Sequence, residues 1–203
     1  MRGIVIPLFA GACIATLSSS VVYGYPPAVG IVGPGRSCMT CHTDNGPWKD
    51  ENMSIIDILD AKTKKSLRAN DGSFVVEVPR WQTRKVLTVI GRAKGDTKPS
   101  PYRNAWLYVD PTRIKTTALS KFAPGWNVNL PMSCRLVGDK LEGFEGARIT
   151  AASMTIRPTG AARDADLELQ VMLTSGESVK RKPKKGLLSN YFLRTVHLKV
   201  VDH

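Results

Sequence analysis

From residue 54 onward, apolar and polar side chains alternate in short runs that turn-forming residues separate. In the run 165–174, leucine or valine occupies every odd position from 167 to 173, with Glu168, Gln170 and Met172 between them. A period of two is that of a β-strand, because successive side chains point to opposite faces of a sheet. The pattern predicts strands that turn one face to a core and the other to water.

Runs of this kind recur along the rest of the chain. They span residues 54–60, 73–79, 85–92, 105–110, 127–137, 148–157, 165–174 and 190–202. A tight-turn signal at 70–72 separates two of them, and no convincing helical period interrupts the series. We therefore predict an all-β fold over residues 54–203, an antiparallel β-sandwich of immunoglobulin-like type.

The composition and the first residues indicate an ordered, exported protein. With 203 residues, 42% of them hydrophobic and 7% aromatic, the chain is long enough for one domain with a core plus a signal and an arm. Residues 1–24 have the pattern of a secretory signal, in which Arg2 precedes an apolar stretch and 22–24 form a cleavage site. No later stretch contains the run of about 18 apolar residues that a membrane-spanning helix needs. We expect no transmembrane helix after signal removal.

The segment between the signal and the sandwich contains Cys38, Cys41 and His42 in the spacing Cys-x-x-Cys-His. This is the spacing of a c-type haem attachment site. Two residues between the cysteines let both sulfurs reach one edge of a porphyrin and form thioethers with its vinyl groups. The histidine that follows brings its imidazole under the iron. We predict one covalently bound haem c, with His42 as the proximal iron ligand.

Two other interpretations of Cys38 and Cys41 stay open. One is a redox-active or structural disulfide, although a thioredoxin-like motif needs a strand before it and a helix after it, which the flanking glycines and prolines do not offer. The other is half of a zinc site, although the remaining candidate ligands, Cys134, His197 and His203, are scattered along the chain.

The motif resembles that of c-type cytochromes. The resemblance implies haem attachment outside the cytoplasm, which agrees with the signal and indicates the periplasm or an equivalent compartment. Small globular cytochromes c wrap the haem in several helices, whereas residues 25–53 form a short, turn-rich arm without a helical period. The haem is therefore expected to lie against the following domain, against another subunit, or partly exposed.

The sandwich has resemblances of its own. Residues 60–67 followed by 71–79 are similar to the first hairpin of fibronectin-like or carboxypeptidase-regulatory-like modules. The order of a Gly/Pro-rich segment, a Cys-x-x-Cys-His motif and a sandwich is similar to that of exported bacterial proteins in which a haem motif precedes a reelin-like sandwich. These resemblances imply the same immunoglobulin-like architecture.

The sequence leaves the sixth iron ligand open. His197 lies on the polar face of the last run, where an ordinary surface histidine is the alternative. Met132 follows a proline and offers a thioether, which would raise the reduction potential. Met53 and His203 are lesser candidates, and a water molecule or a residue of another chain are further alternatives.

Cys134 is left without a disulfide partner if the motif cysteines carry haem. It is expected to be buried, to pair with another subunit in a homo- or hetero-oligomer, or to approach the iron.

Positive charge predicts the kind of partner. The formal net charge is +12, and a compact basic run stands ahead of the last strand. It consists of Lys180, Arg181, Lys182, Lys184 and Lys185. An exported protein seldom meets nucleic acid, so we expect none. The run predicts electrostatic docking on an acidic redox protein or a larger redox complex, with a solvated loop as the alternative.

These observations lead to one function and two alternatives. We expect a monohaem c-type cytochrome that carries electrons or serves as an accessory or structural haem subunit of a larger redox assembly, a role in which the protein is not an enzyme. The first alternative is an enzyme or a ligand-binding haem protein that binds a small ligand at an open sixth position. The second is a haem-free adhesion or assembly sandwich in which Cys38 and Cys41 form a disulfide. No catalytic triad, phosphate-binding loop or paired-carboxylate arrangement stands out.

Overall fold

The computed structural model describes residues 43–108, 123–129, 135–175 and 188–202. They form a short 3-10 turn, η3 (Glu51–Met53), and nine strands. The strands are β1 (Ser54–Asp60), β2 (Phe74–Pro79), β3 (Arg84–Arg92), β4 (Tyr102–Tyr108), β5 (Trp126–Asn129), β6 (Arg135–Leu136), β7 (Arg148–Pro158), β8 (Ala165–Thr174) and β9 (Ser189–Val201).

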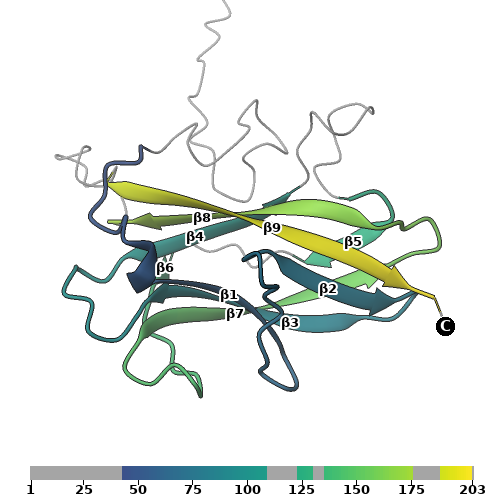
Figure 1. Ribbon diagram of the computed structural model, residues 1–203, viewed down its shortest axis with the longest axis horizontal. Coiled ribbons are helices and arrows are strands. Elements are labelled where there is room, and N and C mark those ends of the chain that lie inside the picture. The colour runs from purple at the N-terminus through teal and green to yellow at the C-terminus, as the bar shows by residue number, and fades with distance from the viewer. Residues whose placement is uncertain (1–42, 109–122, 130–134, 176–187, 203) are drawn as a thin grey trace, which may run out of the picture.

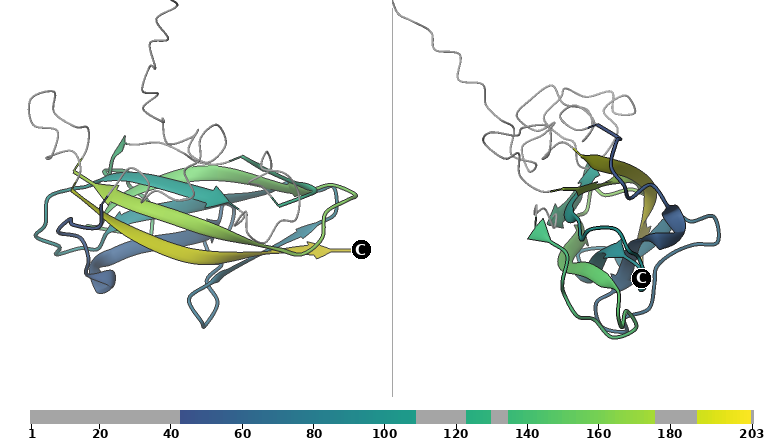
Figure 2. Two further views of the ribbon diagram at one scale, coloured as in Figure 1. Left: turned by 90° about the horizontal axis from the view of Figure 1, so that it is seen from above. Right: turned by 90° about the vertical axis from the view of Figure 1, so that its left-hand side faces the viewer.

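Two sheets pack face to face (Figure 1). The first has the order β1-β3-β7-β5, and all its neighbouring strands are antiparallel. The second has the order β2-β9-β8-β4-β6, in which β2 and β9 form the one parallel pair. Figure 2 shows the two layers from above and from one end. The described chain is thus an all-β, immunoglobulin-like sandwich, as the alternation predicts, with one parallel pair in an otherwise antiparallel arrangement.

The core lies between the inner faces of the two sheets. Ile58 of β1 and Val86 of β3 are fully buried in one sheet, and Val76 of β2 and Val196 of β9 are fully buried in the other. These residues belong to one contiguous cluster. Burying a side chain of this size stabilises the fold by about 1.5–3 kcal/mol, so the apolar stripe of each strand determines which face turns inward.

The predicted run 127–137 is wrong as a single strand. It contains β5 in the first sheet and β6 in the second, with residues 130–134 between them outside the described part. Pro131 within the run has no amide to donate to a ladder, which disfavours an uninterrupted strand. The predicted first hairpin also differs, because β1 and β2 lie in different sheets and do not pair.

The predicted water-facing side of β8 is only partly correct. Glu168 is half-buried as expected, but Gln170 and Met172 are 1% and 0% exposed. β8 lies in the interior of its sheet, between β9 and β4, and this half of the strand is covered on both faces. The methionine suits such a place, and Gln170 has a polar partner there. A period of two shows which residues share a face, but not whether that face meets water.

β9 has strand neighbours on both sides over only a few residues. β8 pairs with it from Ser189 to Leu198, whereas β2 begins to pair only at Val196. Residues 189–195 of β9 therefore have an edge without a β2 neighbour. An uncovered edge presents backbone groups that need other partners. The residues that follow the Cys-x-x-Cys-His motif supply some of them.

The turn between β2 and β3 holds Trp81 in a left-handed backbone conformation, with φ of +66°. For a residue with a Cβ atom this conformation costs about 1–2 kcal/mol. The Trp81 amide donates to the Pro158 carbonyl at 3.0 Å, and its own carbonyl accepts from Arg157 Nε at 3.1 Å. These contacts with the end of β7 hold the backbone in place despite the strain.

We expect Trp81→Gly to be more stable than Trp81→Ala by about 1 kcal/mol, because both lose the indole and only alanine retains the conflict at positive φ. Urea unfolding of both variants measures the difference. Gln82→Gly and Gln82→Ala, at the exposed neighbouring position whose φ is not positive, form the control pair. Equal stability of the two variants at position 81 would contradict the assigned strain.

Candidate functional site

Residues 43–50, which directly follow His42, are bound to the start of β9. The Gly46 amide donates to the Ser189 carbonyl at 2.7 Å, and the Ser189 hydroxyl donates to the Thr43 carbonyl. The Ser189 amide donates to Asn45 Oδ1 at 3.3 Å. The segment therefore provides partners for the edge of β9 that β2 leaves uncovered. We call residues 43–50 the anchor segment.

Asn190 connects the anchor segment to the sandwich through both ends of its amide. Its Nδ2 donates to Asp44 Oδ1 at 2.8 Å, and its Oδ1 accepts from the Trp48 amide at 2.6 Å. Asn190 is 1% exposed. A buried amide must be paired to offset its desolvation, so these two bonds favour a single position of the segment on β9.

Gly46 allows the anchor segment to approach β9 closely. A Cβ atom at this position would lie 2.7 Å from Asn190 Oδ1 and 2.8 Å from the Ser189 carbonyl carbon. Both distances are shorter than a non-bonded contact allows, and one of the two atoms belongs to the backbone. Any side chain at position 46 would push the segment away from the strand.

Trp48 seals the end of the core. Its side chain is 1% exposed and belongs to the main core cluster, and its indole Nε1 donates to the Pro99 carbonyl at 2.9 Å. A buried tryptophan combines a large apolar area with one polar group that needs a partner. The anchor segment is therefore part of the folded sandwich and not a loose extension of it.

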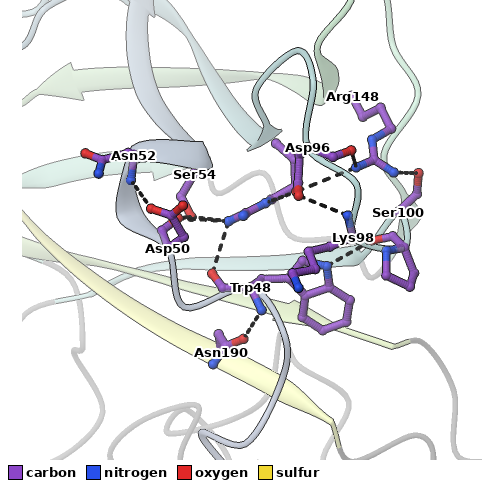
Figure 3. Close-up of polar contacts among 11 residues, drawn as sticks. Trp48, Asp50, Asn52, Ser54, Asp96, Lys98, Ser100, Arg148 and Asn190 are labelled. Carbon is purple, nitrogen blue, oxygen red and sulfur yellow. Dashed lines mark hydrogen bonds and ion pairs between the residues drawn. The ribbon is translucent and has the colours of Figure 1, made fainter.

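A buried arginine holds the other side of the anchor segment (Figure 3). Arg92 Nη1 donates to the Trp48 carbonyl at 3.0 Å, to the Asp50 carbonyl at 3.1 Å and to Ser54 Oγ at 2.6 Å. The Arg92 side chain is only 1% exposed. Asp50 also caps η3, since its carboxylate accepts from the Asn52 amide at 2.9 Å.

The positive charge of Arg92 is balanced by Asp96. The Arg92 Nε lies 2.5 Å from Asp96 Oδ2, and Arg148 Nη2 lies 3.6 Å from the same oxygen. Burial raises the pKa of Asp96, but the hydrogen bonds from Arg92 and the Lys98 amide and the charges of the two arginines outweigh it, so the pKa is lowered. The carboxylate stays ionised and the buried ion pair is maintained at neutral pH.

Asp44 lies at the beginning of the anchor segment. The hydrogen bond from Asn190 lowers the pKa of its carboxyl, burial acts in the opposite direction, and the Tyr191 amide and the Lys49 ammonium lower it further. The Lys49 Nζ is 3.7 Å from Asp44 Oδ2. The net result is a pKa below the ordinary value of 3.8.

Most of the predicted site residues lie outside the described residues. These are the signal and the motif residues Cys38, Cys41 and His42, together with Met132, Cys134, His203 and the basic run at 180–185. His42 is adjacent in sequence to Thr43, whose carbonyl accepts from Ser189. The described structure therefore fixes the point at which the motif is attached to the sandwich.

The points where the basic run joins the sandwich are described as well. The chain leaves β8 at Ser175 and returns to β9 at Leu188, and the Ser175 amide donates to the Leu188 carbonyl at 2.9 Å. Thr174 pairs with Ser189 in the ladder. Both ends of residues 176–187 therefore meet the sandwich beside the residues that bind the anchor segment.

His197 is described and lies farther along β9. Its Nδ1 is 2.7 Å from Asp166 Oδ1, and its side chain is 31% exposed. A histidine held by a carboxylate in this way presents its second nitrogen in a fixed orientation, as metal-bound histidines do. At about 3.3 Å per residue, His197 is about 26 Å along the strand from Ser189. Its assignment as the sixth ligand stays a prediction.

An open hollow of about 650 Å³ lies beside His197, lined by residues of η3, the 68–73 turn and β9. Its two arginines are already engaged. Arg68 donates to the Ile56 carbonyl and stacks on the Phe74 ring, and Arg194 pairs with Glu51 at 2.7 Å. In the described part of the chain, no group of three or more His, Cys, Asp or Glu side chains is placed to hold a metal ion.

Two exposed leucines flank the attachment point of the anchor segment. Leu188 and Leu193 are 38% and 43% exposed, and they are two of the three large hydrophobic side chains exposed among the described residues. The sequence reasoning missed them, and it missed Ser189 and Asn190. Leu193 shares the odd-numbered, polar face of the last run with His197, so the alternation could have indicated its exposure. Leu188 lies outside the predicted run, and its exposure is seen only in the fold.

Comparisons with known proteins do not assign the chain to a family. No protein-family model matches the chain, and no curated protein matches it. Among solved structures, it is similar to a cohesin module from a Clostridium perfringens family 33 glycoside hydrolase, at 11% identity with a TM-score of 0.35, covering 74% of this chain and 97% of that one. A family 123 glycoside hydrolase from the same organism matches at 11% identity with a TM-score of 0.28, over 74% of this chain and 28% of that one.

None of the described helices is long and apolar enough to cross a membrane.

We expect Asn190→Ala to loosen the anchor segment and to lower the free energy of unfolding by about 1–3 kcal/mol, because it leaves the buried Trp48 amide without its partner. Thermal unfolding and amide exchange at Trp48 measure both effects. Asn52→Ala, the same change at an exposed side chain, is the control and should have little effect. Slow exchange at Trp48 in the Asn190 variant would contradict the assignment.

The lowered pKa of Asp44 also predicts acid release of the anchor segment. A carboxyl with a lowered folded-state pKa stabilises the fold above its unfolded-state pKa, and this stabilisation is lost as the pH falls through the folded-state value. We therefore expect amide exchange at Gly46, corrected for the intrinsic rate, to accelerate below the ordinary value of 3.8. Asp44→Asn should remove most of this dependence. An identical pH profile in that variant would rule out Asp44 as the titrating group.

Proposed function

We propose that this protein is an exported monohaem c-type cytochrome that carries electrons or serves as an accessory haem subunit of a larger redox assembly. The observation that carries the proposal is the attachment of the motif. Cys38, Cys41 and His42 stand in the spacing of a haem site, and the next residue, Thr43, begins a segment that is hydrogen-bonded into the sandwich.

The anchor segment makes a short arm sufficient for holding a haem. A free arm would leave a porphyrin tethered by two thioethers and surrounded by water. Consecutive Cα atoms are about 3.8 Å apart, so the Cα atom of His42 is that close to Thr43, whose carbonyl is bound by Ser189. The sandwich then serves as the rigid support that the helices of small cytochromes c provide by wrapping.

The surface beside the attachment point suits a porphyrin. Leu188 and Leu193 expose apolar area on either side of the residues that bind the anchor segment. Leu188 directly precedes Ser189, whereas Leu193 lines the hollow beside His197 farther along β9. We propose that Leu188 contacts the porphyrin edge and keeps it partly out of water, which favours a higher reduction potential.

The basic run supports a docking role at the same end of the molecule. Lys180 is five residues beyond Ser175, and Lys185 is three residues before Leu188. A chain spans at most about 3.6 Å per residue, so these cations remain within about 18 Å of the anchored edge. A positive surface close to a partly exposed haem edge would steer an acidic redox protein to it.

Each part of the chain has one task in this proposal. The bound haem would supply the one-electron chemistry of its iron. His42 would bind the iron, Cys38 and Cys41 would attach the macrocycle, and the anchor segment would keep both beside β9. Met132 remains a candidate for the sixth ligand in this arrangement, whereas His197, about 26 Å along β9 from Ser189, is too far away to bind the iron of a haem held at the anchor segment. No side chain of the protein needs to make or break a bond during turnover.

The test is expression of the full chain in a host with c-type haem maturation, followed by a pyridine haemochrome assay of the purified protein. We expect a c-type spectrum with one haem per chain. Cys38→Ala and Cys41→Ala should each lose stable covalent haem, because each removes one thioether. Cys134→Ala, a thiol outside the motif, is the matched control and should retain it.

Other outcomes would redirect the assignment. A colourless protein would refute the cytochrome proposal and favour the sandwich with a Cys38–Cys41 disulfide. A high-spin spectrum of the purified chain would favour an open sixth position and binding of a small ligand. A sharp low-spin spectrum would favour a filled sixth position and electron transfer.

A further inference from the structure

The end of the sandwich opposite the anchor segment exposes one large aromatic side chain. Trp81 is 57% exposed, the highest fraction among the large hydrophobic residues of the described part. It follows β2, which runs parallel to β9 and ends opposite Val201. At about 3.3 Å per residue, this end lies about 40 Å along β9 from Ser189. The right-hand side of Figure 1 shows β2 and β9 ending together.

The structure holds this exposed side chain firmly. A Cβ atom on Gly160 would come within 2.9 Å of Trp81 Cζ2, so the indole lies directly against the Gly160 backbone. The neighbouring Arg80 binds the same turn, because its Nη1 donates to the Thr159, Gly160 and Ala162 carbonyls at 3.0–3.2 Å. Arg80 Nε also pairs with Asp202 at 2.8 Å.

The strain at Trp81 is not needed to close the turn. Glycine adopts a φ of +66° without steric cost, whereas tryptophan must be forced into it. Strained residues that the surrounding structure holds in place are concentrated at functional sites. A rigid, exposed tryptophan has little conformational entropy left to lose on binding, and tryptophan and arginine dominate the energetics of protein interfaces.

Unpaired cations surround Trp81. The guanidinium of Arg157, whose Nε contacts the Trp81 carbonyl, pairs with no carboxylate of the described chain. Lys85 and Thr155 are ladder partners, which places Lys85 on the same outer face as Arg157 and at the same end. Of the carboxylates at this end, Asp60 and Asp202 are bound by arginines and Asp164 by Lys199. Glu77 of β2 is exposed without an ion-pair partner among the described residues, so the unpaired cations are in excess. Further exposed cations at this end, in the turns that follow β1 and β7, are Lys62, Lys64, Lys65 and Arg163.

We infer that this end of the sandwich is a protein-docking surface, with Trp81 as its anchor and an acidic protein surface as its partner. The charge specifies the partner. Trp81 would be buried in the complex, and the excess of unpaired lysine and arginine around it favours a partner that carries carboxylates at the rim of the interface. A single tryptophan favours a protein pocket over a membrane, where basic proteins need a larger apolar face to insert. The sandwich would thus carry two separate surfaces, one at the anchor segment and one at Trp81.

The test is selection of a random dodecamer peptide library on the immobilised full chain, followed by fluorescence-anisotropy titration of the enriched peptides. We expect peptides rich in Asp and Glu around an apolar residue. Trp81→Ala should weaken their binding by about tenfold or more, as removal of a hot-spot residue does. The double variant K85Q/R163Q should weaken it at low salt more than at high salt. Lys140→Gln, an exposed lysine in the 138–147 loop before β7, is the control.

Three outcomes would overturn the inference. The first is that the enriched peptides have no excess of acidic residues. The second is that the peptides bind the Trp81→Ala variant as tightly as the original chain. The third is that the protein cosediments with phosphatidylglycerol vesicles in a way that depends on Trp81, while no peptide shows binding that depends on Trp81. Circular dichroism of each variant checks that it is folded, which is expected because the substituted side chains are exposed. The haemochrome assay does not depend on Trp81, so the two proposals fail or succeed independently.

Discussion

The guanidinium of Arg92 stands at the junction on which the arrangement of the molecule depends. It is buried, it neutralises Asp96, and it binds two carbonyls of the anchor segment and the first residue of β1. A buried ion pair is weak evidence for net stability, because desolvation offsets much of the attraction. Its value lies in specificity, since removal of any partner would leave a buried charge or donor unpaired.

This junction explains how an irregular arm becomes part of a sandwich. Asn190 holds the anchor segment from β9, and Arg92 holds it from β3, so both sheets share it. Trp48 then fills the space between the two contacts and extends the core to the end of the molecule. The anchor segment and the two residues that flank the basic segment, Ser175 and Leu188, consequently meet at one edge of the sandwich.

The alternation of side chains predicted the strands well where each lies within one sheet. β1 and β8 occupy the predicted residues, and β2, β3, β7 and β9 differ by one residue at one or both ends. β4 begins three residues before the predicted run 105–110. Three larger failures have a common cause, since they depend on neighbours that are distant in sequence. These are the division of 127–137 between two sheets, the parallel pairing of β2 with β9, and the burial of Gln170 and Met172.

The sequence by itself determined the all-β class and the approximate strands, and it predicts the chemistry of the Cys-x-x-Cys-His spacing, because periodicity and ligand spacing are local properties of a chain. Only the tertiary structure decided where the segment that follows the motif is attached. Ser189 and Asn190 are about 145 residues from their partners in the anchor segment, and no local pattern marks them. The exposure of Trp81 and Leu188 was likewise decided by packing, since burial depends on what the fold places against a residue.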